Sequence, residues 1–104
     1  MKNISVEELK TRLDSDEKIN LIDCREPHEY AEFNLGGKLV PVGKIQTMQI
    51  EDLEDLKDEE VVVYCRSGNR STMACMVLDQ MGFKNTVNVT GGVLAWQEKY
   101  GKVK

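Results

Sequence analysis

VVVYCRSGNRS, residues 61–71, passes from an apolar run into a cysteine and then into a polar segment that contains a glycine. The β-branched residues of Val61–Tyr64 are typical of a buried β-strand. Apolar side chains then return at helical intervals, which predicts a helix over Ser71–Met81 that ends at Gly82. These apolar residues are Ala74, Val77, Leu78 and Met81. A strand joined by a short loop to a helix is the repeating unit of α/β proteins.

The remaining segments alternate between helical and extended patterns in the same way. Strands are predicted at Ile19–Ile22 and Thr86–Val89, and Lys38–Val42 is expected to be extended. A first helix is predicted after the capping-box pair Ser5 and Glu8, with Val6, Leu9 and Leu13 on its apolar side. A second is predicted from Pro27 to Phe33. Two more are predicted around Ile50, Leu53 and Leu56 and over Val93–Tyr100. We therefore predict one α/β domain over residues 1–104 with a mainly parallel central sheet.

The composition favours a soluble globular chain, because 40% of its 104 residues are hydrophobic and 31% are charged. A net charge of −4 provides no basic surface, so no nucleic-acid partner is predicted. No apolar run could cross a bilayer and no apolar leader is visible, so we expect no membrane contact and a cytoplasmic location. Residues 51–60 include seven acidic side chains, which we interpret as the solvated face of a helix.

Three cysteines, Cys24, Cys65 and Cys75, lack the spacing of a zinc site or of a CxxC motif. Their odd number argues against a disulfide framework, so free thiols in a reducing compartment are expected. The only histidine, His28, is expected on the surface of a helix. We predict no metal and no cofactor, because one histidine and unpaired cysteines make a poor ligand set.

The segment after the predicted strand Val61–Tyr64 has the residues that surround an anion. Cys65 stands where the strand ends, and ligands of α/β sheets collect beyond the carboxyl ends of strands. Gly68 allows a tight loop whose amides point inward, and the following helix adds free N–H groups and the positive end of its dipole. With Arg66 and Arg70 nearby, these groups favour a thiolate, which is the nucleophilic form of cysteine. The alternative is that Cys65 is only a small buried apolar residue.

Three segments together carry a resemblance to a known family. CRSGNRS, residues 65–71, resembles the Cys-x-x-Gly-x-Arg active-site loop of rhodanese-like domains. DCRE at residues 23–26, followed by Glu29-Tyr30, resembles the Asp-x-Arg…Glu-Tyr/Phe element of that family. TGGVLAW at residues 90–96 resembles its Gly-Gly-x-x-x-Trp element. The three segments occur in the order found in the family.

The resemblance implies a rhodanese-like α/β fold, in which helices flank both faces of the central sheet. It also implies a sulfurtransferase, in which Cys65 takes the outer sulfur of thiosulfate or a similar small anionic donor. The resulting persulfide passes the sulfur to cyanide, to a thiol or to a protein sulfur acceptor. The family loop would bind donor and persulfide through Arg66, Ser67, Gly68, Asn69, Arg70 and Ser71, and Arg66 would attract anionic donors.

The chain departs from the family pattern at two places. FNLGGK at residues 33–38 stands where the family usually has a Gly-His-Ile-x-Gly-Ala-like segment, and Cys24 stands where valine is more common. A phosphatase or arsenate reductase is one alternative, but these enzymes need Cys-x5-Arg and this chain has Cys-x4-Arg. A noncatalytic or sulfur-relay binding module is another, although such modules commonly lack the cysteine that is present here.

Other residues are interpreted as structural. Asp23 and Arg25 are expected to form an ion pair or hydrogen bonds, and Trp96 to anchor the last helix in the core. Cys24 and Cys75 are expected to be buried, with a disulfide to the persulfide cysteine as the alternative. Three methionines of the helix after the loop, Met73, Met76 and Met81, are expected to pack inward.

Overall fold

Five parallel strands form the centre of the computed structural model, which describes residues 1–102. The strands are β1 (Lys2–Ile4), β2 (Leu21–Asp23), β3 (Lys38–Leu39), β4 (Glu60–Tyr64) and β5 (Asn85–Val89), in the sheet order β1-β5-β4-β2-β3. All four strand pairings are parallel. Each parallel connection needs a crossover, and the chain uses helices for this purpose. The predicted α/β class and parallel sheet are confirmed.

Helical segments connect the strands. They are α1 (Val6–Asp14), α2 (Pro27–Glu32), α3 (Val42–Gln46), the 3-10 helix η1 (Glu51–Leu56), α4 (Asn69–Gln80) and α5 (Gly92–Tyr100). The predicted capping box is present at the start of α1, where the Glu8 amide donates to the Ser5 hydroxyl. Gly82 follows α4 with a φ of +99°, the left-handed conformation that glycine supplies at helix ends.

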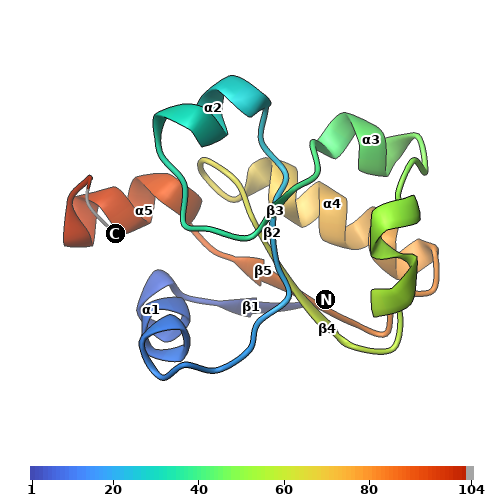
Figure 1. Cartoon of the computed structure of the whole chain (residues 1–104), viewed down its shortest axis with the longest axis horizontal. Helices are drawn as coiled ribbons and strands as arrows, with labels where there is room; N and C mark the ends of the chain where they lie inside the picture. Colours follow the sequence, from blue (N-terminus) through green and yellow to red (C-terminus); the bar gives the residue numbers. More distant parts are fainter. Residues whose placement is uncertain (103–104) are drawn as a thin grey trace.

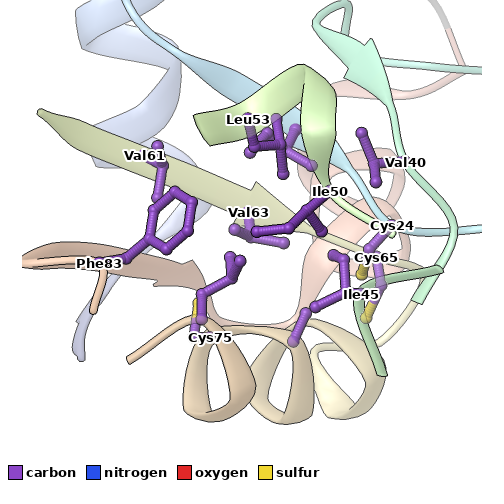
Figure 2. Packing of buried hydrophobic residues seen from close by; sticks show 13 residues of the cluster. Cys24, Val40, Ile45, Ile50, Leu53, Val61, Val63, Cys65, Cys75 and Phe83 are labelled. Atoms are coloured by element: carbon purple, nitrogen blue, oxygen red, sulfur yellow. The ribbon is translucent and has the colours of Figure 1, made fainter. Parts of the chain in front are cut away.

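Two hydrophobic cores cover the two faces of the sheet. The side chains of β4 alternate between them, because successive residues of a strand point to opposite faces. Val61 and Val63 pack with α3, η1 and α4, the core that Figure 2 shows. Val62 and Tyr64 pack with α1 and α5 on the other face. Figure 1 shows α1 and α5 on the left and α3 and α4 on the right, so the predicted helices on both faces are confirmed.

The structure differs from the local predictions at several points. Residues 2–4 form the edge strand β1, although the polar N-terminal segment gave no strand pattern. The extended segment stops at Leu39, since Val42 already opens α3. The helix predicted around Ile50 and Leu53 is a 3-10 helix, and the helix after Cys65 begins at Asn69 rather than Ser71. None of the helices within residues 1–102 is long and apolar enough to cross a membrane.

The methionine prediction is wrong for two of three residues. Met73 and Met76 are 48% and 54% exposed, while Met81 packs against the core. The reason is that α4 turns Ala74, Cys75 and Leu78 toward the sheet, which leaves the opposite side of the helix in solvent. Burial is as predicted for Cys24, Cys75 and Trp96, and His28 is exposed.

The segment that departs from the family pattern is held by polar contacts. The Leu35 amide donates to the Tyr64 hydroxyl at 3.0 Å, and this hydroxyl donates to the Gly36 carbonyl at 2.9 Å. Arg25 forms the predicted ion pair with Asp23, at 2.8 Å, and also donates to the Phe33 carbonyl. Both partners of this pair are almost fully buried. The segment is thus fixed to β4 and to the end of β2.

Candidate active site

Cys65 is the first residue after β4, at the carboxyl edge of the parallel sheet. Only 1% of the residue is exposed. The loop that follows, drawn in yellow in Figure 1, passes beneath α2 and turns into α4 at Gly68. Gly68 has a φ of +102°, a conformation that side chains resist, and a Cβ there would lie 3.2 Å from the Gly91 nitrogen. The sequence therefore makes the turn tight enough to bring the start of α4 back over the cysteine.

Hydrogen-bond donors of the loop and of α4 converge on the cysteine sulfur. The Gly68 amide lies 3.1 Å and the Ser71 amide 3.3 Å from Cys65 Sγ. The Ser71 hydroxyl oxygen is also 3.3 Å from the sulfur. Since these amides belong to the first turn of α4, the positive end of the helix dipole faces the same atom. The arrangement stabilises negative charge on sulfur.

A buried polar network fixes the orientation of Ser71. Its hydroxyl lies 2.5 Å from Asn88 Oδ1, while Asn88 Nδ2 donates to Asn3 Oδ1 at 3.0 Å. The network thus links the site to β5 and to the edge strand β1. Asn88 was not identified from the sequence, although a polar residue within the buried run TVNV of β5 was an available signal.

The pKa of the Cys65 thiol is lowered to about 4, so the residue is a thiolate at neutral pH. The largest cause is the neighbouring Cys24 thiol, and burial opposes it. The hydroxyl and amide of Ser71 and the Gly68 amide lower the pKa further. The sequence predicted the direction of this shift but attributed it to the helix and the arginines, without a contribution from Cys24.

Arg70 supplies less free positive charge than expected. Its guanidinium donates to both carboxylate oxygens of Glu29 on α2, at 2.7 and 2.8 Å. This pair lowers the pKa of Glu29 to about 2. The sequence shows no acid between Arg66 and Arg70, but the fold brings Glu29 from a distant segment. Arg70 therefore ties α4 to α2 over the loop, and its charge is largely offset.

The other predicted loop residues lie toward solvent. Arg66, Ser67 and Asn69 are exposed. Arg66 borders a cavity of about 120 Å³ between α2, the loop and α5. The cavity is lined by Arg25, Glu29, Glu32, Phe33, Arg66, Val93, Leu94 and Gln97. Arg66 is thus the residue through which the loop borders this cavity.

The start of α5 supports the loop from the other side. The amides of Val93 and Leu94 each donate at 2.9 Å, to the carbonyls of Cys65 and Arg66. Gly92 makes this approach feasible, because a Cβ there would overlap the Cys65 carbonyl oxygen. No contact between Gly92 and the loop was predicted, since a contact between such distant segments leaves no local pattern.

Taken together, the fold and this geometry define a class: α/β proteins that hold a cysteine sulfur among the backbone amides of a loop at the carboxyl edge of a parallel sheet. Among residues 1–102 no three histidine, cysteine or acidic side chains gather as a metal site would require. The reactive group that this geometry presents is the Cys65 sulfur, which the Gly68 and Ser71 amides face.

The chain belongs to the rhodanese-like domain family, whose model matches residues 5–99. It is 46% identical over 99 residues to the Bacillus subtilis protein named "Putative sulfurtransferase YtwF", covering 93% of this chain and 91% of that one. It is 38% identical to a Schizosaccharomyces pombe protein named "Putative thiosulfate sulfurtransferase, mitochondrial", covering 95% and 82%. A rhodanese-like domain protein from Staphylococcus aureus has a similar structure, with a TM-score of 0.80 at 31% identity, covering 92% of this chain and 91% of that one.

Proposed function

We propose that this protein is a sulfurtransferase that carries sulfane sulfur as a persulfide on Cys65. The donor is thiosulfate or a similar small anion, and the acceptor is cyanide or a thiol, including a protein thiol. The observation that carries the proposal is the Cys65 thiolate held by the Gly68 and Ser71 amides. The names of the related proteins support sulfur transfer, and one of them supports thiosulfate as the donor.

The chemistry proceeds by two displacements on sulfur. The Cys65 thiolate attacks the outer sulfur of thiosulfate, the sulfur–sulfur bond breaks, and sulfite leaves with the bonding electron pair. The outer sulfur is then bound to Cys65 as a persulfide. In the second displacement the acceptor attacks this sulfur, and the Cys65 thiolate leaves and is ready for another cycle. The nucleophile is a covalent carrier, so the reaction needs no cofactor.

The loop residues have separate roles in this proposal. The Gly68 and Ser71 amides stabilise the charge on the inner sulfur. Arg70 holds the loop closed through Glu29. The exposed segment formed by Arg66, Ser67 and Asn69 contacts the donor, and Arg66 provides the charge that attracts it. Six residues, Arg66 to Ser71, thus form the cradle of donor and persulfide.

Two other functions fit the site less well. A noncatalytic binding module would not need a buried thiol whose pKa is lowered to about 4. A phosphatase would need space for a tetrahedral oxyanion, whereas the amides of this short loop already lie 3.1 and 3.3 Å from the sulfur. A single additional sulfur atom needs less space in such a loop than a phosphate group.

A two-stage assay tests the proposal. The protein is incubated with thiosulfate, freed of excess donor on a desalting column, and only then mixed with cyanide. We expect about one equivalent of thiocyanate per protein chain in the second stage, because the covalent intermediate survives removal of the donor. Initial rates should show the matching ping-pong pattern. A rate law in which both substrates must bind together would contradict the proposal.

Replacing Arg66 by alanine is expected to raise the KM for thiosulfate about fivefold and to leave kcat nearly unchanged. An exposed ionic contact is worth roughly 1 kcal/mol, and 1.4 kcal/mol corresponds to a tenfold change in binding. The matched control is Lys84→Ala, which removes one charge from the exposed pair with Asp58, beyond the far end of α4. Equal KM values for the two variants would show that Arg66 does not bind the donor.

A further inference from the structure

A second cysteine lies directly beside Cys65. Strands β2 and β4 pair in parallel with Asp23 opposite Tyr64, and the Cys24 amide donates to the Tyr64 carbonyl at 3.1 Å. Cys24 and Cys65 are the next residues of the two strands. Because adjacent strands are about 4.8 Å apart, residues in this register have neighbouring side chains.

Both cysteines point into the same core. Cys24 is 0% and Cys65 1% exposed, and both belong to the cluster between the sheet, α3 and α4. Figure 2 shows the two sulfur atoms close to each other at the edge of this cluster. Two thiols in a dry environment interact more strongly than they would in water, since the low local dielectric strengthens hydrogen bonds.

The two sulfurs take opposite roles in this contact. The neighbouring Cys65 sulfur raises the pKa of the Cys24 thiol, and burial raises it further. The same contact is the largest cause of the lowered pKa of Cys65. Cys24 therefore keeps its proton at neutral pH, and its S–H group is available as a hydrogen-bond donor to the neighbouring thiolate.

We propose that Cys24 is a positioning residue of the site, whose thiol donates a hydrogen bond to the Cys65 sulfur and keeps this sulfur deprotonated. Cys24 itself does not attack the persulfide. The effect of Cys24 on the Cys65 thiolate does not depend on the proposed function. Only the advantage of this effect for sulfur transfer rests on the proposed function. A stabilised Cys65 thiolate is available to attack the donor, and it is also a better leaving group when the acceptor takes the sulfur.

Charged and titratable groups from several elements surround the pair. Asp23 at the end of β2 disfavours ionisation of Cys24, while Arg70 on α4 favours it. Arg70 is in turn paired with Glu29 of α2. Cys75 of α4 lies in the same core, and its own pKa is raised to about 12, chiefly by burial. A test must separate the contribution of Cys24 from the contributions of these groups.

The experiment is a pH profile of Cys65 alkylation by iodoacetamide, with the modified residue identified by peptide mass. The variants are Cys24→Val, Cys24→Ser and, as the matched control, Cys75→Ala. A hydrogen bond to a charged group is worth about one to two pKa units, so we expect Cys24→Val to raise the midpoint by this amount. Since the wild-type pKa is about 4, its alkylation near pH 5 should be about two- to tenfold slower than in the wild type. Cys24→Ser, which retains a donor, and Cys75→Ala should keep the wild-type midpoint.

The same variants provide outcomes that would overturn the inference. A midpoint for Cys24→Val equal to that of the wild type would show that Cys24 only packs. An equal shift in Cys75→Ala would show a general loosening of the core instead. If Cys24 attacked the persulfide, a Cys24–Cys65 disulfide would form and sulfide would be released. The wild-type protein would then be lighter by two hydrogens after thiosulfate treatment, whereas the Cys24 variants would not. This result would also overturn the inference. If the predicted shift occurs but no persulfide ever forms, the inference holds and the proposed function fails.

Discussion

Cys65→Ser is expected to gain no sulfur from thiosulfate, whereas the wild-type protein gains the mass of one sulfur atom and loses it on addition of cyanide. Serine has nearly the same shape, but its hydroxyl does not ionise at neutral pH and cannot form the persulfide. Sulfur transfer should fall by more than about a thousandfold, as is usual when a catalytic nucleophile is removed. Intact mass spectrometry before and after donor and cyanide checks the prediction directly.

The matched control for this variant is Cys75→Ala. Cys75 is also buried, and it lies in the core between α4 and the sheet. Its replacement should preserve the sulfur gain, even if the protein becomes somewhat less stable. If Cys65→Ser gained a sulfur atom from thiosulfate, or if Cys75→Ala failed to gain one, the persulfide would be assigned to a different cysteine.

Gly92→Ala is expected to have the largest effect on stability and to disable the site at the same time. Its φ of +55° already costs a side chain about 1–2 kcal/mol. The added Cβ would also overlap the Cys65 carbonyl oxygen and lie 2.8 Å from that of Arg66. Moving the loop away would break the two hydrogen bonds from the start of α5, each worth about 1 kcal/mol. Urea unfolding should therefore show a loss of about 3 kcal/mol or more.

Gly82→Ala separates the steric effect from the backbone effect. Gly82 also has a positive φ, of +99°, but a Cβ there would meet nothing within 4 Å. This variant should lose only about 1–2 kcal/mol and retain full sulfur transfer per folded molecule. If Gly92→Ala proves no more harmful than Gly82→Ala, α5 does not support the loop in the way described here.

The sequence predicted best the elements whose signal is local. The apolar run of β4, the helical spacing in α4 and the capping box of α1 are patterns within a few residues, and all three are present. Edge strand β1 was missed because three residues with one buried side chain produce no alternation. The exposed Met73 and Met76 were misplaced for a related reason, since apolar character alone does not say which side of a helix faces the sheet.

The candidate site shows the same division. Cys65 and the residues that donate to its sulfur, Gly68 and Ser71, are neighbours in the sequence and were predicted together. The contacts of Glu29 with Arg70 and of Gly92 with the loop join segments that are far apart along the chain. The pairing of Cys24 with Cys65 depends on strand order, which no local pattern specifies. Long-range contacts decide how the site is braced, whereas local ones decide where it is.

The position of β1 at the sheet edge also determines when the protein can finish folding. Lys2 pairs with Val87, so within residues 1–102 β1 has a single neighbour in the sheet, β5, which is the strand farthest from it along the chain. Such a pairing closes nearly the whole chain into one loop and belongs to the slow, late class of folding contacts. β1 has no partner in the sheet until β5 has been made, and until β1 docks the outer edge of β5 is open to the strands of other chains. A nascent chain that stalls before β5 emerges would thus hold the cysteine loop but lack the strand that carries Asn88, the partner that orients Ser71.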